Sequence, residues 1–188
     1  MEFLLPCKTY PLLSRANWTK SLPPNEMWPD LNLNELQIKQ LKSIKEGLQV
    51  HIAGEKDIEK LIPVIRELRK HRTDAQLRKK LSKQMKDRFE VIFIGDEKTV
   101  YAMAGFRTME VIFSGKTLYV DDLITHPDHR QKGYGGALLR WMIQYAKANH
   151  YDHFSLDSGP ERKKAQRLYL KHGLEGIGAH FAKDVKDL

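Results

Sequence analysis

The sequence lacks the residues on which several common classes of protein depend. Cys7 is the only cysteine among 188 residues, so an internal disulfide and a cysteine-based metal cluster are both excluded. No apolar run approaches the roughly 20 residues that a membrane-spanning helix needs. The first residues carry no basic segment and Pro6 cuts their apolar run short, which argues against a secretory signal. We therefore predict a cytoplasmic protein that does not enter the membrane.

Histidine is present but is not grouped as a metal site requires. The eight histidines are scattered through the chain. His126 and His129 are three residues apart, but they flank Pro127 in a predicted loop and have no third ligand beside them. Two such histidines are more often polar surface than metal ligands, so we predict no metal.

The chain length and the distribution of prolines predict one domain with an N-terminal extension. A chain of 188 residues suits one domain better than two. Residues 1–47 hold a proline-punctuated stretch, with Trp18 and Trp28, and then helical spacing from about residue 34. Because disordered tails are poor in aromatics, we expect this arm and helix to pack on a domain formed by residues 48–188.

Positive charge is in excess and is concentrated in one segment. The formal net charge is +8, and ten lysines and arginines lie from Arg66 to Arg88, against Glu67, Asp74 and Asp87. We favour the interpretation that two helices carry solvated basic faces. A basic wall beside a ligand site is the alternative. A nucleic-acid-binding module built on these helices is a third interpretation, which we do not favour.

Hydrophobic spacing predicts an order of elements that implies a mixed sheet. Short strands with paired turns come first and a βαβ crossover comes late, so we expect an α/β fold with helices on both faces of the sheet. Thr73 is a predicted N-cap, and Gly105 suggests a bulge or a bend in its strand. The predicted strands cover about 49–53, 90–94, 99–113, 116–125, 152–157 and 175–185, and the predicted helices about 54–68, 73–88, 135–149 and 161–172.

A glycine-rich loop between a predicted strand and a predicted helix is the most informative segment. It reads Asp128-His129-Arg130-Gln131-Lys132-Gly133-Tyr134-Gly135-Gly136. Glycines permit close approach of the backbone, and the unpaired N–H groups at a helix start attract anions. Arg130 and Lys132 add full positive charges. The segment therefore predicts a site for a phosphate-bearing ligand, and a pyrophosphate suits it well.

Three other interpretations of this loop fit less well. A nucleotide-binding P-loop ends in Gly-Lys-Ser/Thr, whereas Ala137 follows the glycines here. A dinucleotide fingerprint has a third glycine where this chain has Leu138, and too few residues follow for the rest of that fold. A simple tight turn into a helix stays open, but it does not account for three glycines and two cations together.

Three separated motifs, in the expected order, resemble the GNAT superfamily of N-acetyltransferases. Arg130-x-x-Gly133-x-Gly135 is similar to its acetyl-CoA signature, and Leu118–Pro127 to its central strand. Ala165-x-x-Leu168-Tyr169-x-x-x-Gly173-Leu174 is similar to its last helix. The resemblance covers about residues 49–185. It implies a GNAT fold: a mixed, mostly antiparallel sheet of about six to seven strands, splayed between the fourth and the fifth.

The resemblance also implies how acetyl-CoA is bound. Backbone N–H groups of the loop would hold the pyrophosphate, and the main chain of the central strand would pair with the pantetheine arm. A bulge near Asp121–Leu123 would start the splay, and one N–H there would polarise the thioester. The implied cofactor-binding residues are Leu123, Ile124, Thr125, Arg130, Gln131, Lys132, Gly133, Tyr134, Gly135, Gly136 and Ala137.

Catalysis by such an enzyme needs a base for the amine and an acid for the leaving thiolate. Asp121 and Asp122 are the candidate bases. Side chains alternate along a strand, so we expect them on opposite faces, with only one at the site. The analogy with diamine acetyltransferases favours Asp121; structural roles for both stay open. Tyr169 is the implied acid, and a core role is its alternative. Arg162 stands where many relatives carry Asn, so one cofactor contact is in doubt.

The resemblance implies direct transfer of an acetyl group from acetyl-CoA to a primary amine. Analogy favours a small-molecule amine over a protein or peptide amine. Asp157, at the end of a strand, is a candidate amine ligand or a turn cap. A sensor that binds acetyl-CoA without catalysis is an alternative, and homodimerisation through an edge strand is open. The sequence does not name the acceptor.

Overall fold

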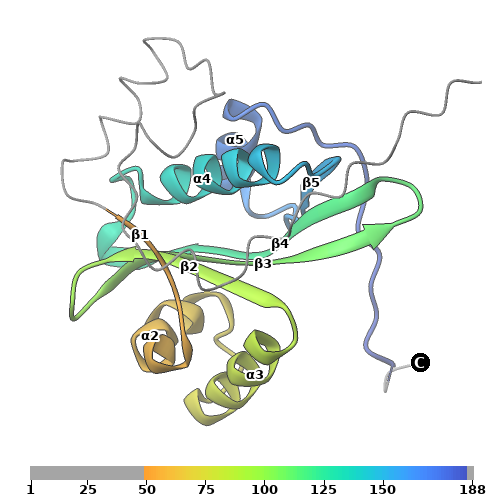
Figure 1. Ribbon diagram of the computed structural model, residues 1–188. Coiled ribbons are helices and arrows are strands. Elements are labelled where there is room, and N and C mark those ends of the chain that lie inside the picture. The colour runs from red at the N-terminus through yellow and green to blue at the C-terminus, as the bar shows by residue number, and fades with distance from the viewer. Residues whose placement is uncertain (1–48, 186–188) are drawn as a thin grey trace, which may run out of the picture. The chain divides into compact units, whose positions relative to one another are not determined.

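A five-stranded mixed sheet organises the part of the chain that the computed structural model describes, residues 49–185. The arm and the helix predicted in the first 48 residues lie outside this part. Neighbouring strands are antiparallel except for the last pair, which is parallel. The strands are, in spatial order, β1 (Val50–Ile52), β2 (Phe89–Gly95), β3 (Val100–Val111), β4 (Gly115–Thr125) and β5 (His153–Leu156) (Figure 1).

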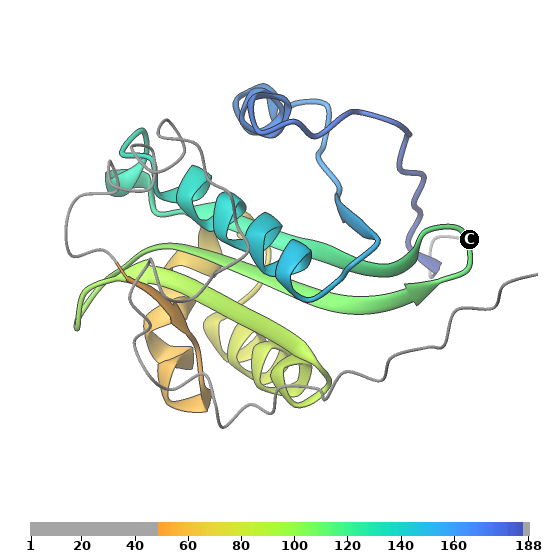
Figure 2. The ribbon, with the colours of Figure 1, turned by 45° about the horizontal axis from the view of Figure 1, so that its top comes forward.

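Helices cover both faces of this sheet, as the sequence predicts. One face carries α4 (Tyr134–Ala148), and the opposite face carries α2 (Ile58–Leu68) and α3 (Asp74–Lys86) (Figures 1 and 2). The helix α5 (Lys163–Lys171) lies on the α4 side. Two short 3-10 turns, η2 (Glu55–Asp57) and η3 (Pro127–His129), precede α2 and follow β4.

Each face of the sheet has its own apolar core. On the α2/α3 face, Leu61, Ile62 and Val64 are almost completely buried, and Leu77 and Leu81 of α3 join them. Their spacing places them on the inner stripe of each helix. The second core lies under α4 and contains Phe106, Leu118, Leu138, Leu139 and Met142. Because strand side chains alternate, β3 and β4 contribute to both cores.

Most of the predicted elements form within one to three residues of their predicted bounds, but the last strand does not. Within residues 49–185 the sheet has five strands rather than six to seven, since 174–184 adopt no helix or strand. Gly176 and Gly178 weaken this segment as a strand. Its apolar residues Ile177 and Phe181 are 74% and 92% exposed, so the segment has no buried face to hold it against the sheet.

The start of α3 confirms the predicted N-cap. The Thr73 hydroxyl accepts a hydrogen bond from the Gln76 backbone N–H at 3.3 Å, and the Gln76 side chain accepts one from the Thr73 N–H at 3.0 Å. This reciprocal capping satisfies two of the N–H groups that a helix start leaves unpaired. It fixes where the basic helix begins.

Candidate active site

A β-bulge interrupts the pairing of β3 with β4 in the middle of the sheet. Gly105 pairs with Asp122 and Phe106 pairs with Val120, so Asp121 is an extra residue on β4. Glycine is required at 105 because an added Cβ would lie 2.3 Å from the Phe89 ring. A bulge bends the strand that carries it. The predicted bulge near Asp121–Leu123 is confirmed, and Gly105, where the sequence suggests a bulge or a bend, lies opposite it on β3.

Beyond the bulge, β4 continues past the last residue with which β5 pairs. The parallel pairing runs from Thr117 opposite His153 to Val120 opposite Leu156, whereas β4 extends to Thr125. The edge of residues 121–125 that faces away from β3 therefore has no β5 partner. An extended chain can add to such an edge through main-chain hydrogen bonds. This is the splay expected between strands 4 and 5.

The glycine-rich loop leads from the end of β4 into α4 and leaves N–H groups unpaired. Gln131 and Gly133 have positive φ values of 62° and 87°, which turn the chain into the helix. The first helical hydrogen bond runs from Ala137 N–H to the Gly133 carbonyl, at 3.0 Å. The preceding N–H groups, of residues 134–136, have no carbonyl partner within the helix and point out of its first turn. That arrangement suits an anion.

The glycines of the first turn of α4 allow close contact with two other elements. A Cβ added at Gly135 would lie 3.2 Å from the Thr125 hydroxyl oxygen of β4. One added at Gly136 would lie 3.2 Å from Nε2 of His172, just after α5. The loop is therefore next to the free edge of β4 and to the last helix, so all three predicted motifs meet here.

The two cations of the loop and one cation of α4 surround this helix start. Arg130 Nε donates to the Thr125 carbonyl at 3.3 Å, and Lys132 Nζ donates to the Asp128 carbonyl at 2.9 Å. The Arg140 Nε is buried and has no hydrogen-bond partner among the described residues. Burial lowers the pKa of His172, and the charge of Arg140 lowers it further. Arg130 also pairs with Glu67 of α2 at 3.5 Å, so Lys132 and Arg140 are the cations here that have no carboxylate partner among the described residues. Sequence analysis missed Arg140.

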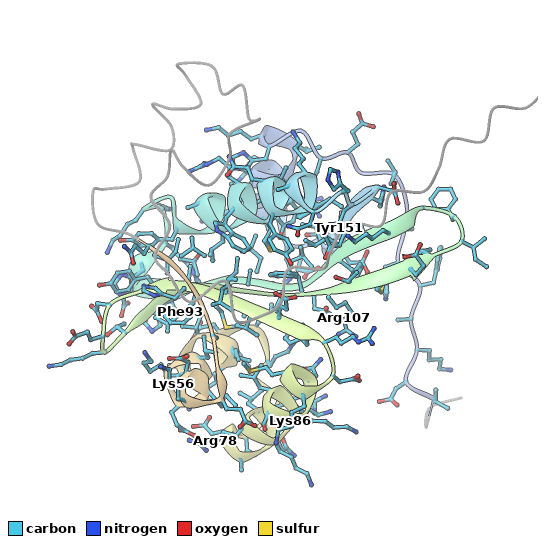
Figure 3. The ribbon with its side chains drawn as sticks, in the orientation of Figure 1. Lys56, Arg78, Lys86, Phe93, Arg107 and Tyr151 are labelled. Carbon is cyan, nitrogen blue, oxygen red and sulfur yellow. The ribbon has the colours of Figure 1, made fainter. Side chains whose placement is uncertain are left out.

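The two acids of β4 both lie on the α2/α3 side, which corrects the expectation that they face opposite ways. Asp121 accepts two hydrogen bonds from Arg107, at 2.8 and 2.6 Å, and the Arg107 guanidinium lies 5.6 Å from the centre of the Phe89 ring. Figure 3 shows Arg107 on the side of the sheet that faces α3. Phe89 belongs to the core under α2 and α3. Asp122 accepts a hydrogen bond at 2.6 Å from Arg69, which directly follows α2. The bulge places two successive residues of β4 against one residue of β3, so the strict alternation fails here.

The two carboxylates differ in how fully they are engaged. Arg107 contacts both oxygens of Asp121. Arg69 contacts only Oδ1 of Asp122, and Oδ2 has no hydrogen-bond partner within residues 49–185. Burial raises the pKa of Asp122 above its ordinary value, the Arg69 charge opposes this, and the negative charge of Asp121 adds to it. Asp122 is thus the carboxylate with an unpaired oxygen, and its raised pKa means that it takes up a proton more readily than an ordinary aspartate does.

A third polar group lies next to these acids. The Tyr119 hydroxyl donates to Asp157 Oδ2 at 2.6 Å, and Nδ1 of His180 lies 2.9 Å from the same oxygen. Burial, reinforced by the hydrogen bond to Asp157, raises the pKa of Tyr119 to about 12. The predicted candidate Asp157 therefore already has partners from β4 and from the C-terminal segment. Sequence analysis missed Arg69, Arg107, Tyr119 and His180, because no local pattern relates them to residues so far along the chain.

Tyr169 lies on the other side of β4. It is partly buried and packs against the α4-side core, as Leu123, Leu156 and Leu168 do. Burial raises the pKa of its phenol, and the Arg162 charge at the start of α5 opposes this. The Tyr169 hydroxyl therefore keeps its proton at neutral pH. The predicted acid and the predicted bases approach β4 from opposite faces.

The part of the chain that the structure describes contains neither a cluster of metal ligands nor a membrane-spanning helix. Within it, no group of three or more His, Cys, Asp or Glu side chains is arranged to hold a metal ion. None of its helices is both long and apolar enough to cross a membrane.

Comparison with known proteins places the chain in a family. A profile described as the acetyltransferase (GNAT) family matches residues 58–174, which is more than half of the chain. The chain therefore belongs to the GNAT family of acetyltransferases. The match includes the bulge, the splay, the glycine-rich loop and α5.

Individual relatives are more distant. An uncharacterized N-acetyltransferase of Bacillus subtilis, YhdJ, is 31% identical over 84 residues, which are 45% of this chain and 59% of that protein. Human N-acetyltransferase 8 is 28% identical over 86 residues, which are 46% of this chain and 38% of that protein. The chain thus matches less than two thirds of the length of either relative.

Solved structures support the fold. The aminoglycoside N-acetyltransferase AAC(6')-Iy, solved in complex with CoA, superposes with a TM-score of 0.64 over 76% of this chain and 99% of that chain. The sequence identity is 13%, so the likeness concerns the fold alone.

Proposed function

We propose that the protein is an N-acetyltransferase that moves the acetyl group of acetyl-CoA directly to a primary amine of a small molecule. One observation carries the proposal: the glycine-rich loop, the unpaired edge of β4 and the partly buried carboxylate of Asp122, whose pKa is raised, converge on one strand. Membership of the GNAT family supports the cofactor, and the local geometry supports the chemistry.

The loop and the free edge of β4 have separate roles in binding acetyl-CoA. The N–H groups from Gln131 to Gly136 would bind the pyrophosphate, helped by the dipole of α4. The main chain of Leu123, Ile124 and Thr125 would pair with the pantetheine arm where β5 has separated. This leaves the thioester near the bulge, between the acids on one face and Tyr169 on the other.

The acceptor must lose a proton before it attacks. A lysine-like amine has a pKa of about 10.4, so its neutral form at pH 7 costs roughly 4.6 kcal/mol. We assign the base to Asp122, because its Oδ2 is free and burial moves its pKa toward the working pH. Asp121, the base favoured by analogy, remains a prediction. Its two oxygens are both held by Arg107, which suits a positioning role.

The transfer is balanced in atoms and protons. Asp122 takes the proton that the ammonium group loses before it attacks. The new C–N bond then forms as the C–S bond breaks, and the thiolate takes a proton from Tyr169. The second proton, which the attacking nitrogen loses as it becomes an amide, returns Tyr169 to its neutral form. A phenol whose pKa is raised by burial stays protonated until the thiolate forms. A backbone N–H at the bulge would stabilise the oxyanion.

The test is a thiol-release assay with acetyl-CoA and a set of small primary amines. We expect turnover by the wild type and a loss of about 100-fold in kcat for Asp122→Asn. Glu110→Gln removes one acid at an exposed position of β3 and is the matched control, with activity unchanged. A folded protein that binds acetyl-CoA but releases no thiol with any amine would contradict the proposal and would favour a non-catalytic sensor.

A further inference from the structure

A pocket on the α2/α3 side of the sheet adjoins the proposed base. Asp122 lines it together with three cations, Arg69 at the end of α2, Arg72 before α3, and Lys80 on α3. The charged lining is therefore three positive groups against one negative group. The apolar walls come from the same two helices and from Phe89 and Met103 of the sheet.

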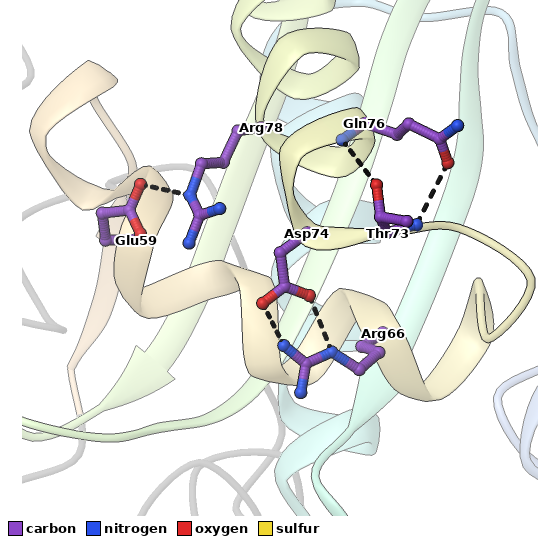
Figure 4. A network of polar contacts seen from close by, with 6 residues as sticks. All are labelled: Glu59, Arg66, Thr73, Asp74, Gln76 and Arg78. Atoms are coloured by element: carbon purple, nitrogen blue, oxygen red, sulfur yellow. Dashed lines mark hydrogen bonds and ion pairs between the residues drawn. The ribbon is translucent and has the colours of Figure 1, made fainter.

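Several cations of the basic segment are used to join the two helices and are not available to a ligand. Arg66 pairs with Asp74, and Arg78 Nε donates to Glu59 Oε1 at 2.7 Å (Figure 4). Lys86 Nζ also pairs, at 3.0 Å, with a carboxylate of η2. These ion pairs give part of the positive charge of the basic segment a structural role.

The cations that line the pocket are placed differently. Arg69 is held by Asp122 at 2.6 Å. Arg72 is half-buried and Lys80 is exposed, and neither side chain has a carboxylate partner within residues 49–185. The pocket therefore offers one carboxylate that can take a proton and two cations that have no counter-charge. Such a lining disfavours a second positive charge on the acceptor.

We infer that the acceptor is a small amine that carries an anionic group, a carboxylate or a phosphate, on the same molecule. Its amine lies toward Asp122, and its anionic group lies toward Arg72 and Lys80. This inference rests on the proposed function and narrows its substrate class. It disfavours polyamine-like and aminoglycoside-like acceptors, whose several positive charges would meet the same cations.

The experiment compares matched amines in the thiol-release assay. The pairs are 4-aminobutanoate with 4-aminobutanamide and phosphoethanolamine with ethanolamine, and 1,4-diaminobutane represents the cationic acceptors. We expect kcat/KM to be about 10-fold or more higher for at least one anionic amine than for its neutral analogue and for the diamine. Lys80→Glu should remove this preference and leave the KM for acetyl-CoA unchanged.

The control is Lys79→Glu, which makes the same change of charge at the neighbouring exposed position, outside the pocket lining. It should keep the preference for the anionic amine. The inference is overturned, and the proposed function stands, if the neutral amines or the diamine react as well as the anionic ones. It is also overturned if Lys79→Glu and Lys80→Glu behave alike. No turnover with any amine, by folded protein that binds acetyl-CoA, contradicts the proposed function itself.

Discussion

The two sides of β4 are built in different ways. On the α4 side, the glycine-rich loop is one continuous segment between β4 and α4, and its features are backbone N–H groups and glycines. On the α2/α3 side, the polar groups are ion pairs between distant segments, such as Arg69 with Asp122, 53 residues apart. A backbone site of the first kind can be read from a local motif. A side-chain site of the second kind exists only once the helices have packed on the sheet.

This difference predicts that the two sides can be damaged separately. The largest effect is expected from Asp122→Asn, which keeps the size of the side chain and removes its charge. We expect kcat to fall by about 100-fold or more while the calorimetric affinity for acetyl-CoA is unchanged. Equal losses of kcat and of affinity for acetyl-CoA would contradict the separate roles of the two sides, because they would mean that Asp122 also supports the cofactor site.

The same variant, Asp122→Asn, also tests which group causes the pH dependence of kcat/KM. Burial raises the pKa of Asp122 above that of an ordinary aspartate. As the pH falls, Asp122 is therefore protonated, and lost as a base, at a higher pH than an ordinary aspartate would be. The kcat/KM of the wild type should therefore decrease on the acid side, in addition to the decrease caused by protonation of the amine. In Asp122→Asn only the contribution of the amine should remain. A wild-type profile that follows the amine alone would argue against this base.

A smaller effect is expected on the opposite side of β4. Tyr169→Phe removes one hydroxyl and keeps the packing of the ring against the α4-side core. We expect kcat to fall about 10-fold, less than for the base, because water can supply some protons to the thiolate. The KM for acetyl-CoA should change little. Unchanged kcat would identify Tyr169 as a core residue, the alternative that its helical position leaves open.

The fold could be predicted from the sequence where an element depends only on residues close together in the chain. The helix periodicity of α2, α3 and α4, the cap at Thr73 and the bulge at Gly105 each depend on a few neighbouring residues. The predicted last strand failed because strand spacing alone does not provide a buried face, and Ile177 and Phe181 stay exposed.

The candidate site, like the fold, could be predicted only in its local parts. The loop and the bulge follow from the glycines and from the motif. The common orientation of Asp121 and Asp122 does not, because one extra residue on β4 reverses the alternation that a regular strand would have. Their arginine partners come from another strand and from a helix end, and charge alone does not identify them among the 32 lysines and arginines of the chain.

The smallest effect is expected from a change at the capped start of α3. It tests whether this turn only supports the pocket proposed for the acceptor or also contacts the acceptor. Thr73→Ala removes the hydroxyl that accepts from the Gln76 N–H. We expect a loss of about 1 kcal/mol in the free energy of unfolding, seen as a Tm lower by roughly 2–4 °C. Catalysis at temperatures well below Tm should be unchanged. A large loss of activity without a change in Tm would show that this turn contacts the acceptor.

The most direct test of the central claim is calorimetric titration of acetyl-CoA into the wild type and Gly135→Glu. The new side chain would begin 3.2 Å from the Thr125 hydroxyl and would place a carboxylate where the pyrophosphate is expected. A carboxylate at a helix start does not oppose folding, so circular dichroism should be unchanged. Gly176→Glu adds the same charge at a position with open space around it and is the control. We predict micromolar binding by the wild type and the control, and none by Gly135→Glu. Absence of binding by the folded wild type, or equal binding by Gly135→Glu, would contradict the account.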